Sequence, residues 1–161
     1  MSEIFKNFVS IVNTTNTEHI IIPSAEINNN ESSYSNSISS KYNVRAEGSI
    51  CQVHSLYISQ IDENRINGSE RYNPKTFKSV DLYIKDIKNP ELKIYIGYDL
   101  RIVTGSPFYI EKNITLESSQ YLCAYCSNQS KDIDINNNNT LVTINNDVNL
   151  NISASSILIT N

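Results

Sequence analysis

Two cysteines with a spacing seen in redox and zinc sites are the first residues that could carry chemistry. Cys123 and Cys126 are separated by two residues, and Cys51 is the third cysteine of the chain. The residues around the pair alternate with period two, which predicts a strand, and positions i and i+3 of a strand point to opposite faces. No second C-x-x-C motif occurs. We therefore expect three reduced thiols that pack as small core hydrophobes.

An acidic stretch near the C-terminus partly matches a calcium-binding loop. Four oxygen-bearing residues have the spacing of ligands 1, 3, 5 and 7 of such a loop: Asp132, Asp134, Asn136 and Asn138. Asn137 stands where the loop requires glycine, and Thr143 stands where it requires a bidentate glutamate. Because both of these positions fail, we expect no metal site.

The two histidines, His19 and His54, belong to no known catalytic motif. The chain has no G-x-S-x-G, H-E-x-x-H, P-loop or dinucleotide-binding glycine pattern. His54 alternates with Leu56 and Ile58, which indicates a partly buried structural histidine on a strand. We therefore predict no catalytic residues and no cofactor, and we expect that the protein is not an enzyme.

Strands must position these residues, because apolar residues recur with period two along the chain and no helical period of useful length occurs. The stretch 114–127 reads I-T-L-E-S-S-Q-Y-L-C-A-Y-C-S, with alternation on both sides of a polar break. This pattern predicts a β-hairpin whose apolar face carries Leu122, Ala124 and Cys126. A hairpin alone is marginal in water, so other strands must cover that face.

Further turns follow from breaks in the same alternation. Residues 8–22 predict a second hairpin, and residues 92–103 predict a third that turns at Gly97-Tyr98-Asp99. In the last strand the apolar residues change parity near Ser155-Ser156. Because a one-residue slip moves side chains to the other face, this change predicts a β-bulge.

About ten short strands at roughly ten-residue spacing predict an all-β fold, an antiparallel β-sandwich of the jelly-roll or Ig-like kind. A chain of 161 residues fits a single domain, residues 1–161, with long polar loops inserted at 27–43 and 62–75. The predicted core residues share the inward faces of these strands: Leu56, Ile58, Leu82, Ile84, Ile114, Leu116, Leu122, Ala124 and Ile152.

Charge and hydropathy exclude two classes of partner. The net charge is −4 and no cluster of lysine and arginine occurs, so we expect no contact with nucleic acid. No run approaches the 18 or more apolar residues that a membrane-spanning helix needs, so we expect no membrane contact. The N-terminus lacks the basic start and apolar stretch of a signal peptide, which predicts synthesis and retention in a cytoplasm.

The order of the predicted strands resembles that of small β-sandwich virion structural proteins of tailed bacteriophages. The resemblance begins with V-H-S-L-Y-I-S-Q-I-D at 53–62, which is similar to an L-Y-I-S-N-I-D strand of that family. It extends, in order, to segments similar to 20–25, 80–84, 92–103, 114–127 and 152–160. The chain departs from the family at Ser119-Gln120, where Gly-Asp is usual, and its loops at 27–43 and 65–75 are longer.

The resemblance implies a structural role in a virion, made in the host bacterial cytoplasm. The first expectation is a capsid decoration, or cement, protein that binds the major capsid protein or other virion proteins as a homo-oligomer or multi-copy array. The alternatives are a neck, tail or baseplate component and a carbohydrate-binding host-recognition module. Besides the N-terminal strand, the candidate contacts are arginine and aromatic residues, which dominate interface energetics: Tyr34, Tyr42, Arg65, Arg71, Tyr72 and Phe77.

Overall fold

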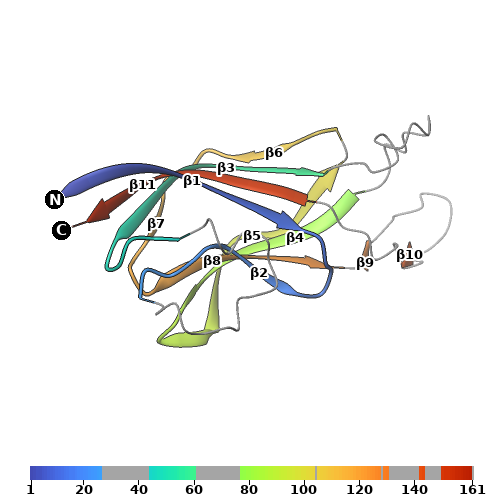
Figure 1. The fold of residues 1–161 in the computed structure, drawn as a ribbon. Helices are drawn as coiled ribbons and strands as arrows, with labels where there is room; N and C mark the ends of the chain where they lie inside the picture. The colour runs from blue at the N-terminus through green and yellow to red at the C-terminus, as the bar shows by residue number, and fades with distance from the viewer. Residues whose placement is uncertain are drawn as a thin grey trace.

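The computed structural model describes residues 1–26, 44–60, 77–103, 105–127, 129–130, 142–143 and 150–160, with the backbone alone at 77, 129–130 and 142–143. Within these ranges the chain forms strands and turns and no helix. The strands form two antiparallel sheets packed face to face (Figure 1). The predicted all-β antiparallel sandwich is therefore confirmed.

Sheet A contains the first and the last strands of the chain side by side. Its order is β1 (Ser2–Val12), β11 (Leu150–Thr160) and β3 (Ile50–Gln60), and both β6 (Phe108–Ile110) and β7 (Ile114–Leu116) pair with the far edge of β3. Ser2 lies opposite Thr160, and the register of β1 with β11 runs without a break to Val12 opposite Leu150. The N-terminal strand is therefore an integral edge of the sheet.

Sheet B has the order β2 (Glu18–Ile22), β8 (Gln120–Ser127), β4 (Phe77–Asp86) and β5 (Asn89–Val103). A separate two-stranded pair joins β9 (Gln129–Ser130) to β10 (Val142–Thr143). The tight turn at Ile87-Lys88 connects β4 to β5, so these two strands form the hairpin of this sheet.

The core lies between the two sheets and is made by their alternating inward-facing side chains. Of the nine predicted core residues, Ile84 is partly buried and packs against this core. The other eight are buried in it: Leu56, Ile58, Leu82, Ile114, Leu116, Leu122, Ala124 and Ile152. Phe8, Ile102 and Leu150 fill the same space, and each is fully buried. Burial of this kind stabilises the fold by about 1.5–3 kcal/mol per large apolar side chain.

All three predicted hairpins are wrong, although most of their strands exist. β7 pairs with β3 in sheet A while β8 pairs with β2 and β4 in sheet B, so the polar break at 117–119 crosses from one sheet to the other. The turn at 13–17 makes a similar crossing between β1 and β2. Gly97 to Asp99 is a bulge within the single strand β5, where Asp99 has a φ of 51°. Alternation identifies a strand but not its neighbour, which explains these errors.

The predicted bulge occurs at the expected pair of residues but on the partner strand. The β11–β3 register shifts between Ser155 and Ser156, and His54 of β3 is the extra residue. β11 keeps one parity throughout, with Leu158 buried. On β3 the parity changes, so that Val53 before the bulge and Leu56 after it both face the core. His54 is consequently exposed, which corrects the predicted partial burial.

Candidate functional site

The predicted interface residues fall almost entirely outside the described part of the chain. Tyr34 and Tyr42 lie in 27–43, and three further candidates lie in 61–76, namely Arg65, Arg71 and Tyr72. Phe77 begins β4, and only its backbone is described. The partly calcium-like residues 132–138 also lie outside. These six contacts therefore stay predictions.

A buried arginine organises the corner where β7 passes to β8, and no motif or periodicity in the sequence indicates its burial. Arg45 is only 4% exposed. Its terminal nitrogens donate to five backbone carbonyl oxygens, four of them at 2.9–3.3 Å, those of Pro23, Ser49, Leu116, Glu117 and Gln120. Its Nε has no hydrogen-bond partner among the described residues. We call this arginine and the carbonyls around it the Arg45 corner.

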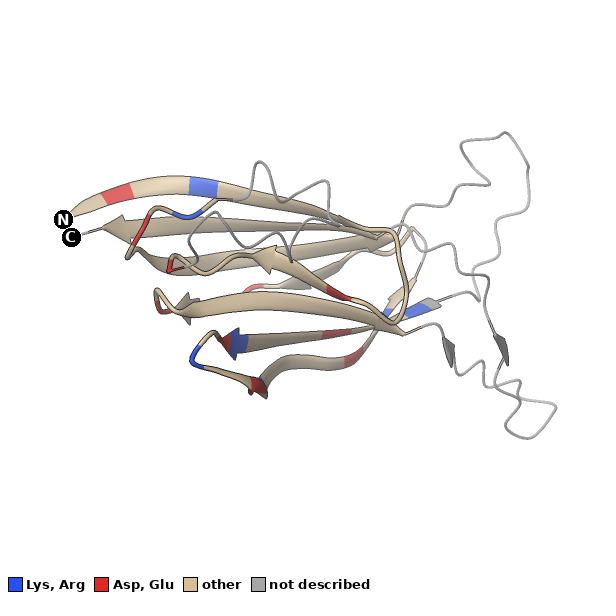
Figure 2. Ribbon diagram, turned by 60° about the horizontal axis from the view of Figure 1, so that its bottom comes forward, with Lys and Arg blue, Asp and Glu red and all other residues tan. Residues whose placement is uncertain are grey.

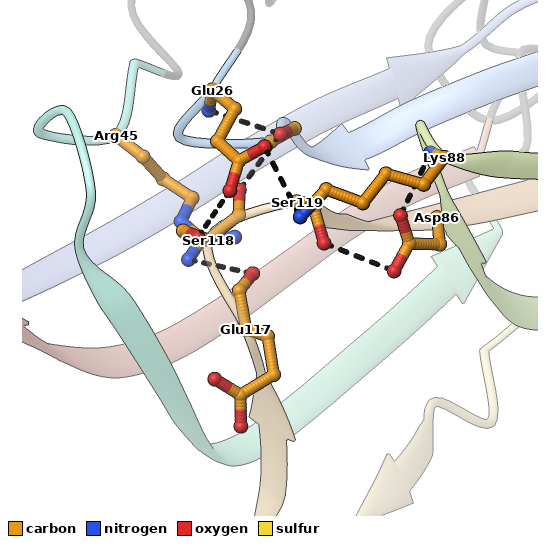
Figure 3. Close-up of polar contacts among 8 residues, drawn as sticks. Glu26, Arg45, Asp86, Lys88, Glu117, Ser118 and Ser119 are labelled. Atoms are coloured by element: carbon orange, nitrogen blue, oxygen red, sulfur yellow. Dashed lines mark hydrogen bonds and ion pairs between the residues drawn. The ribbon is translucent and has the colours of Figure 1, made fainter.

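Within the part of the chain that the structure describes, no carboxylate pairs with the Arg45 guanidinium. The Glu117 side chain points away from Arg45. Glu117 accepts a hydrogen bond from Arg45 through its backbone carbonyl oxygen and not through its carboxylate (Figure 3). Burial is the main cause that lowers the pKa of Arg45. Burying a cation is unfavourable unless its donors are satisfied. The two terminal nitrogens carry four of the five N–H groups of the guanidinium, and five carbonyl oxygens accept from them, so the arginine links three chain segments.

Hydroxyl and carboxyl groups next to the Arg45 corner bond to one another (Figure 3). The Ser118 hydroxyl donates to Glu26 at 2.6 Å, and the Ser119 hydroxyl donates to Asp86 at 2.9 Å. The second oxygen of Asp86 accepts the Lys88 backbone N–H at 2.8 Å. A serine nucleophile needs an adjacent general base that is itself oriented by a third group. These serines instead donate to carboxylates that stabilise the β4–β5 turn and the sheet-to-sheet crossing, which favours a structural role.

The two histidines lie in different sheets and contact neutral side chains. Nε2 of His19 is 2.9 Å from the Thr14 hydroxyl and 3.2 Å from the Thr14 carbonyl oxygen. Burial lowers the pKa of His19, and the bond to the carbonyl offsets part of this effect. Nδ1 of His54 is 3.3 Å from the Asn113 side-chain oxygen. Both interactions bridge neighbouring segments.

The three thiols are buried and unpaired, and they occupy two different places. Cys51 and Cys126 lie in the core between the sheets, whereas Cys123 lies in a smaller cluster on the outer side of sheet B. The C-x-x-C pair therefore points to opposite faces, as the strand geometry predicts. Burial raises the pKa of all three thiols, that of Cys126 to about 11. Protonated thiols are poor nucleophiles and metal ligands.

On the outer side of sheet B, the smaller cluster buries aromatic side chains among their neighbours on the same face. Tyr83 and Cys123 are buried there, next to Tyr121. The Glu18 carboxylate accepts a hydrogen bond from the Tyr83 hydroxyl at 2.7 Å. It also forms an ion pair with the Lys85 ammonium at 3.1 Å. Burial and the neighbouring Glu18 carboxylate raise the pKa of Tyr83. This face therefore combines aromatic rings with fixed charges.

The outer face of sheet A has the opposite character. The five strands of this sheet contain two Asp, Glu, Lys or Arg residues, Glu3 and Lys6, and both are on β1. The four strands of sheet B contain nine (Figure 2): Glu18, Lys78, Asp81, Lys85, Asp86, Glu91, Lys93, Asp99 and Arg101. We define the sheet A face as the side chains that alternate with the buried ones on β1, β11 and β3, together with Tyr109 of β6.

The sheet A face exposes large apolar side chains. Phe5 is 85% exposed, and Val9, Ile11 and Tyr109 are each about half exposed or more. One row crosses the whole sheet, with Val9 opposite Ser153, Ser153 opposite Tyr57, and Tyr57 opposite Tyr109. The core of a protein–protein interface is depleted of charge and rich in aromatic residues. Among the described residues, this face fits that composition best.

Comparison with known proteins adds no identification. The chain matches no protein-family model, and the search of curated proteins finds no similar sequence. Among the described residues, no three His, Cys, Asp or Glu side chains gather as a metal site would require, and no helix is long and apolar enough to cross a membrane. The outer faces of the two sheets are therefore the candidate functional surfaces of the described residues.

Proposed function

We propose that the protein is a structural component of a tailed-phage virion, most specifically a capsid decoration protein that binds the major capsid protein. The sheet A face carries this proposal, because it presents Phe5, Val9, Ile11 and Tyr109 on a surface almost without charge. Removing such a surface from water requires little desolvation of ionised groups. The resemblance of residues 53–62 and the later strands to phage virion proteins supports the same role.

The size of the sheet A face suits a contact that is repeated many times. A strand residue adds about 3.3 Å and neighbouring strands lie about 4.8 Å apart. Three strands of 11 residues, with the two three-residue strands β6 and β7 in the fourth position, therefore give a face of about 600 Å². A standard stable interface buries about 800 Å² on each partner. One copy alone would bind moderately, and an array of linked copies would gain from avidity.

A binding experiment with matched variants tests this role. Fluorescently labelled protein is mixed with capsids of the phage that encodes it, and bound protein is measured after sedimentation. We expect wild-type protein to bind, and the double variant F5E/I11E, which puts two charges on the sheet A face, to bind at least about tenfold more weakly. The variant L92E, at an exposed leucine of β5, should bind like wild type. Equal binding by F5E/I11E and wild type would overturn the proposal.

A neck, tail or baseplate position is the alternative within the same class, and copy number separates the two. A shell component is present in hundreds of copies, whereas a component on a closed ring of the tail is present in about six to a few dozen. Quantitative mass spectrometry of purified virions, scaled to the major capsid protein, gives this number directly. A count of a few dozen or fewer would exclude decoration of the shell.

A further inference from the structure

Three tyrosine rings form a continuous series on the outer face of sheet B. Tyr83 of β4 lies 5.5 Å from Tyr95 of β5, measured between ring centroids, and Tyr95 lies 5.4 Å from Tyr98. The series begins at the buried Tyr83 and ends at the surface, because Tyr95 is 47% exposed and Tyr98 is 72% exposed. We call these residues the tyrosine series.

The buried end of the tyrosine series is fixed in place. The Tyr83 hydroxyl donates to Glu18, and the Lys93 ammonium lies 4.6 Å from the centroid of the Tyr83 ring. Both contacts hold the ring on which Tyr95 packs, and Tyr95 in turn supports Tyr98. A ligand that packs on the two exposed rings would find them already ordered, which lowers the entropy lost on binding.

The bulge of β5 places two carboxylates beside the exposed rings. Asp81 lies on the same face of β4 as Tyr83, two residues away, and its Oδ1 accepts the Asp99 backbone N–H at 2.8 Å. Asp99 Oδ1 accepts the Ser79 hydroxyl at 2.5 Å. Each carboxylate is thus oriented through one oxygen, and the second oxygen of each has no hydrogen-bond donor among the described residues.

We propose that the tyrosine series, with Asp81 and Asp99, binds a neutral polysaccharide. Aromatic rings offer an apolar surface for the C–H faces of sugar rings, and ionised carboxylates accept short, strong bonds from hydroxyl groups. A protein partner would have to desolvate Asp81, Asp99 and Lys93 together, which is unfavourable without matching charges. An acidic polysaccharide would be repelled by the two aspartates. A hydroxyl-rich uncharged ligand avoids both costs.

The proposal goes beyond a structural role in a virion, because it gives the second sheet a ligand of its own. The sheet A face and the tyrosine series lie on opposite sides of the sandwich, since each is the outer side of its own sheet (Figure 1). Binding through one face therefore leaves the other accessible. A particle that displays this protein would present the tyrosine series outward if sheet A meets the shell.

Affinity electrophoresis tests the proposal on the isolated full-length chain, without capsids, so its outcome is independent of the proposed virion role. The protein migrates through native gels that contain dextran, mannan or galactan as neutral probes, and alginate as an acidic one. We expect at least one neutral probe to retard wild-type protein and alginate to have no effect. Retardation by none of the neutral probes, or by alginate alone, would overturn the proposal.

Three variants identify the surface that binds. Y98A removes the most exposed ring and should weaken binding about tenfold or more. D99N removes the Asp99 charge and should also weaken binding. Asparagine tolerates the φ of 51° at this position. The matched control is Y109A, at a similarly exposed tyrosine on the sheet A face. It should bind like wild type. Circular dichroism confirms that each variant is folded, and an unchanged affinity of folded Y98A would contradict the assignment.

Discussion

Replacing the buried Arg45 should destabilise the corner where β7 passes to β8. In R45M the apolar part of the side chain is kept and five carbonyl oxygens lose a charged donor. A hydrogen bond to a charged group contributes about 1.5–3 kcal/mol. Counting only the bonds to Gln120 (2.9 Å) and Ser49 gives about 3–6 kcal/mol. The charge no longer has to be desolvated, which offsets part of this sum.

We therefore expect R45M to lose about 3 kcal/mol in the free energy of unfolding, measured by urea denaturation at pH 7. At about 2–4 °C per kcal/mol for a chain of this size, Tm should fall by about 6–12 °C. R45K keeps the charge but cannot reach all five carbonyls, so its loss should be intermediate. The control is R101M, at an exposed arginine of β5, with a loss below about 1 kcal/mol. A loss for R45M no larger than that for R101M would refute the role assigned to the Arg45 corner.

Three further perturbations test other parts of the structure. Because the pKa of Cys126 is raised to about 11, the folded thiol stays protonated where the unfolded one ionises; the free energy of unfolding should fall between about pH 9 and 11, and less steeply in C126A. Burial lowers the pKa of His19, so the folded state favours the neutral ring; stability should fall as pH drops below about 6.5 in urea titrations, and H19Q should reduce that slope. Deleting His54 should remove the bulge and leave Val53 and Leu56 on the same face of a regular strand, so a cooperative thermal transition should remain, whereas deleting Tyr57 makes Leu56 and Ile58 adjacent and should abolish it; loss of the transition on deletion of His54 would show that His54 is not the extra residue.

The alternation of apolar side chains could predict the class of fold and most of its strands. It failed at connections, because a polar break such as 117–119 looks the same whether the next strand pairs with the previous one or crosses to the other sheet. It also placed the bulge on β11 instead of β3. In β3 the apolar residues Val53 and Leu56 have opposite parity, a pattern that by itself would indicate a strand buried on both faces. An extra residue between them explains the same pattern with one core.

The candidate surfaces were harder to predict, since they depend on which strands are neighbours. Arg45 follows a polar stretch, and nothing in its neighbours distinguishes it from a solvent-exposed arginine. Tyr83 and Tyr95 meet only because the β4–β5 hairpin sets them opposite each other. The low charge of sheet A is visible only after segments from both ends of the chain are placed in one sheet. Composition contained the necessary residues, and topology brought them together.

The position of β11 between β1 and β3 has a consequence for synthesis on the ribosome. β1 emerges before residues 13–149, and the strand that pairs with it, Leu150–Thr160, emerges after them. Phe8 and Val12 are fully buried in the finished protein, but they have no partner strand on that side while residues 13–149 are translated. Pairing over such sequence separation slows folding. The nascent chain therefore carries an unpaired apolar strand until translation reaches residues 150–160, and that interval is when it is most exposed to aggregation or to chaperone capture.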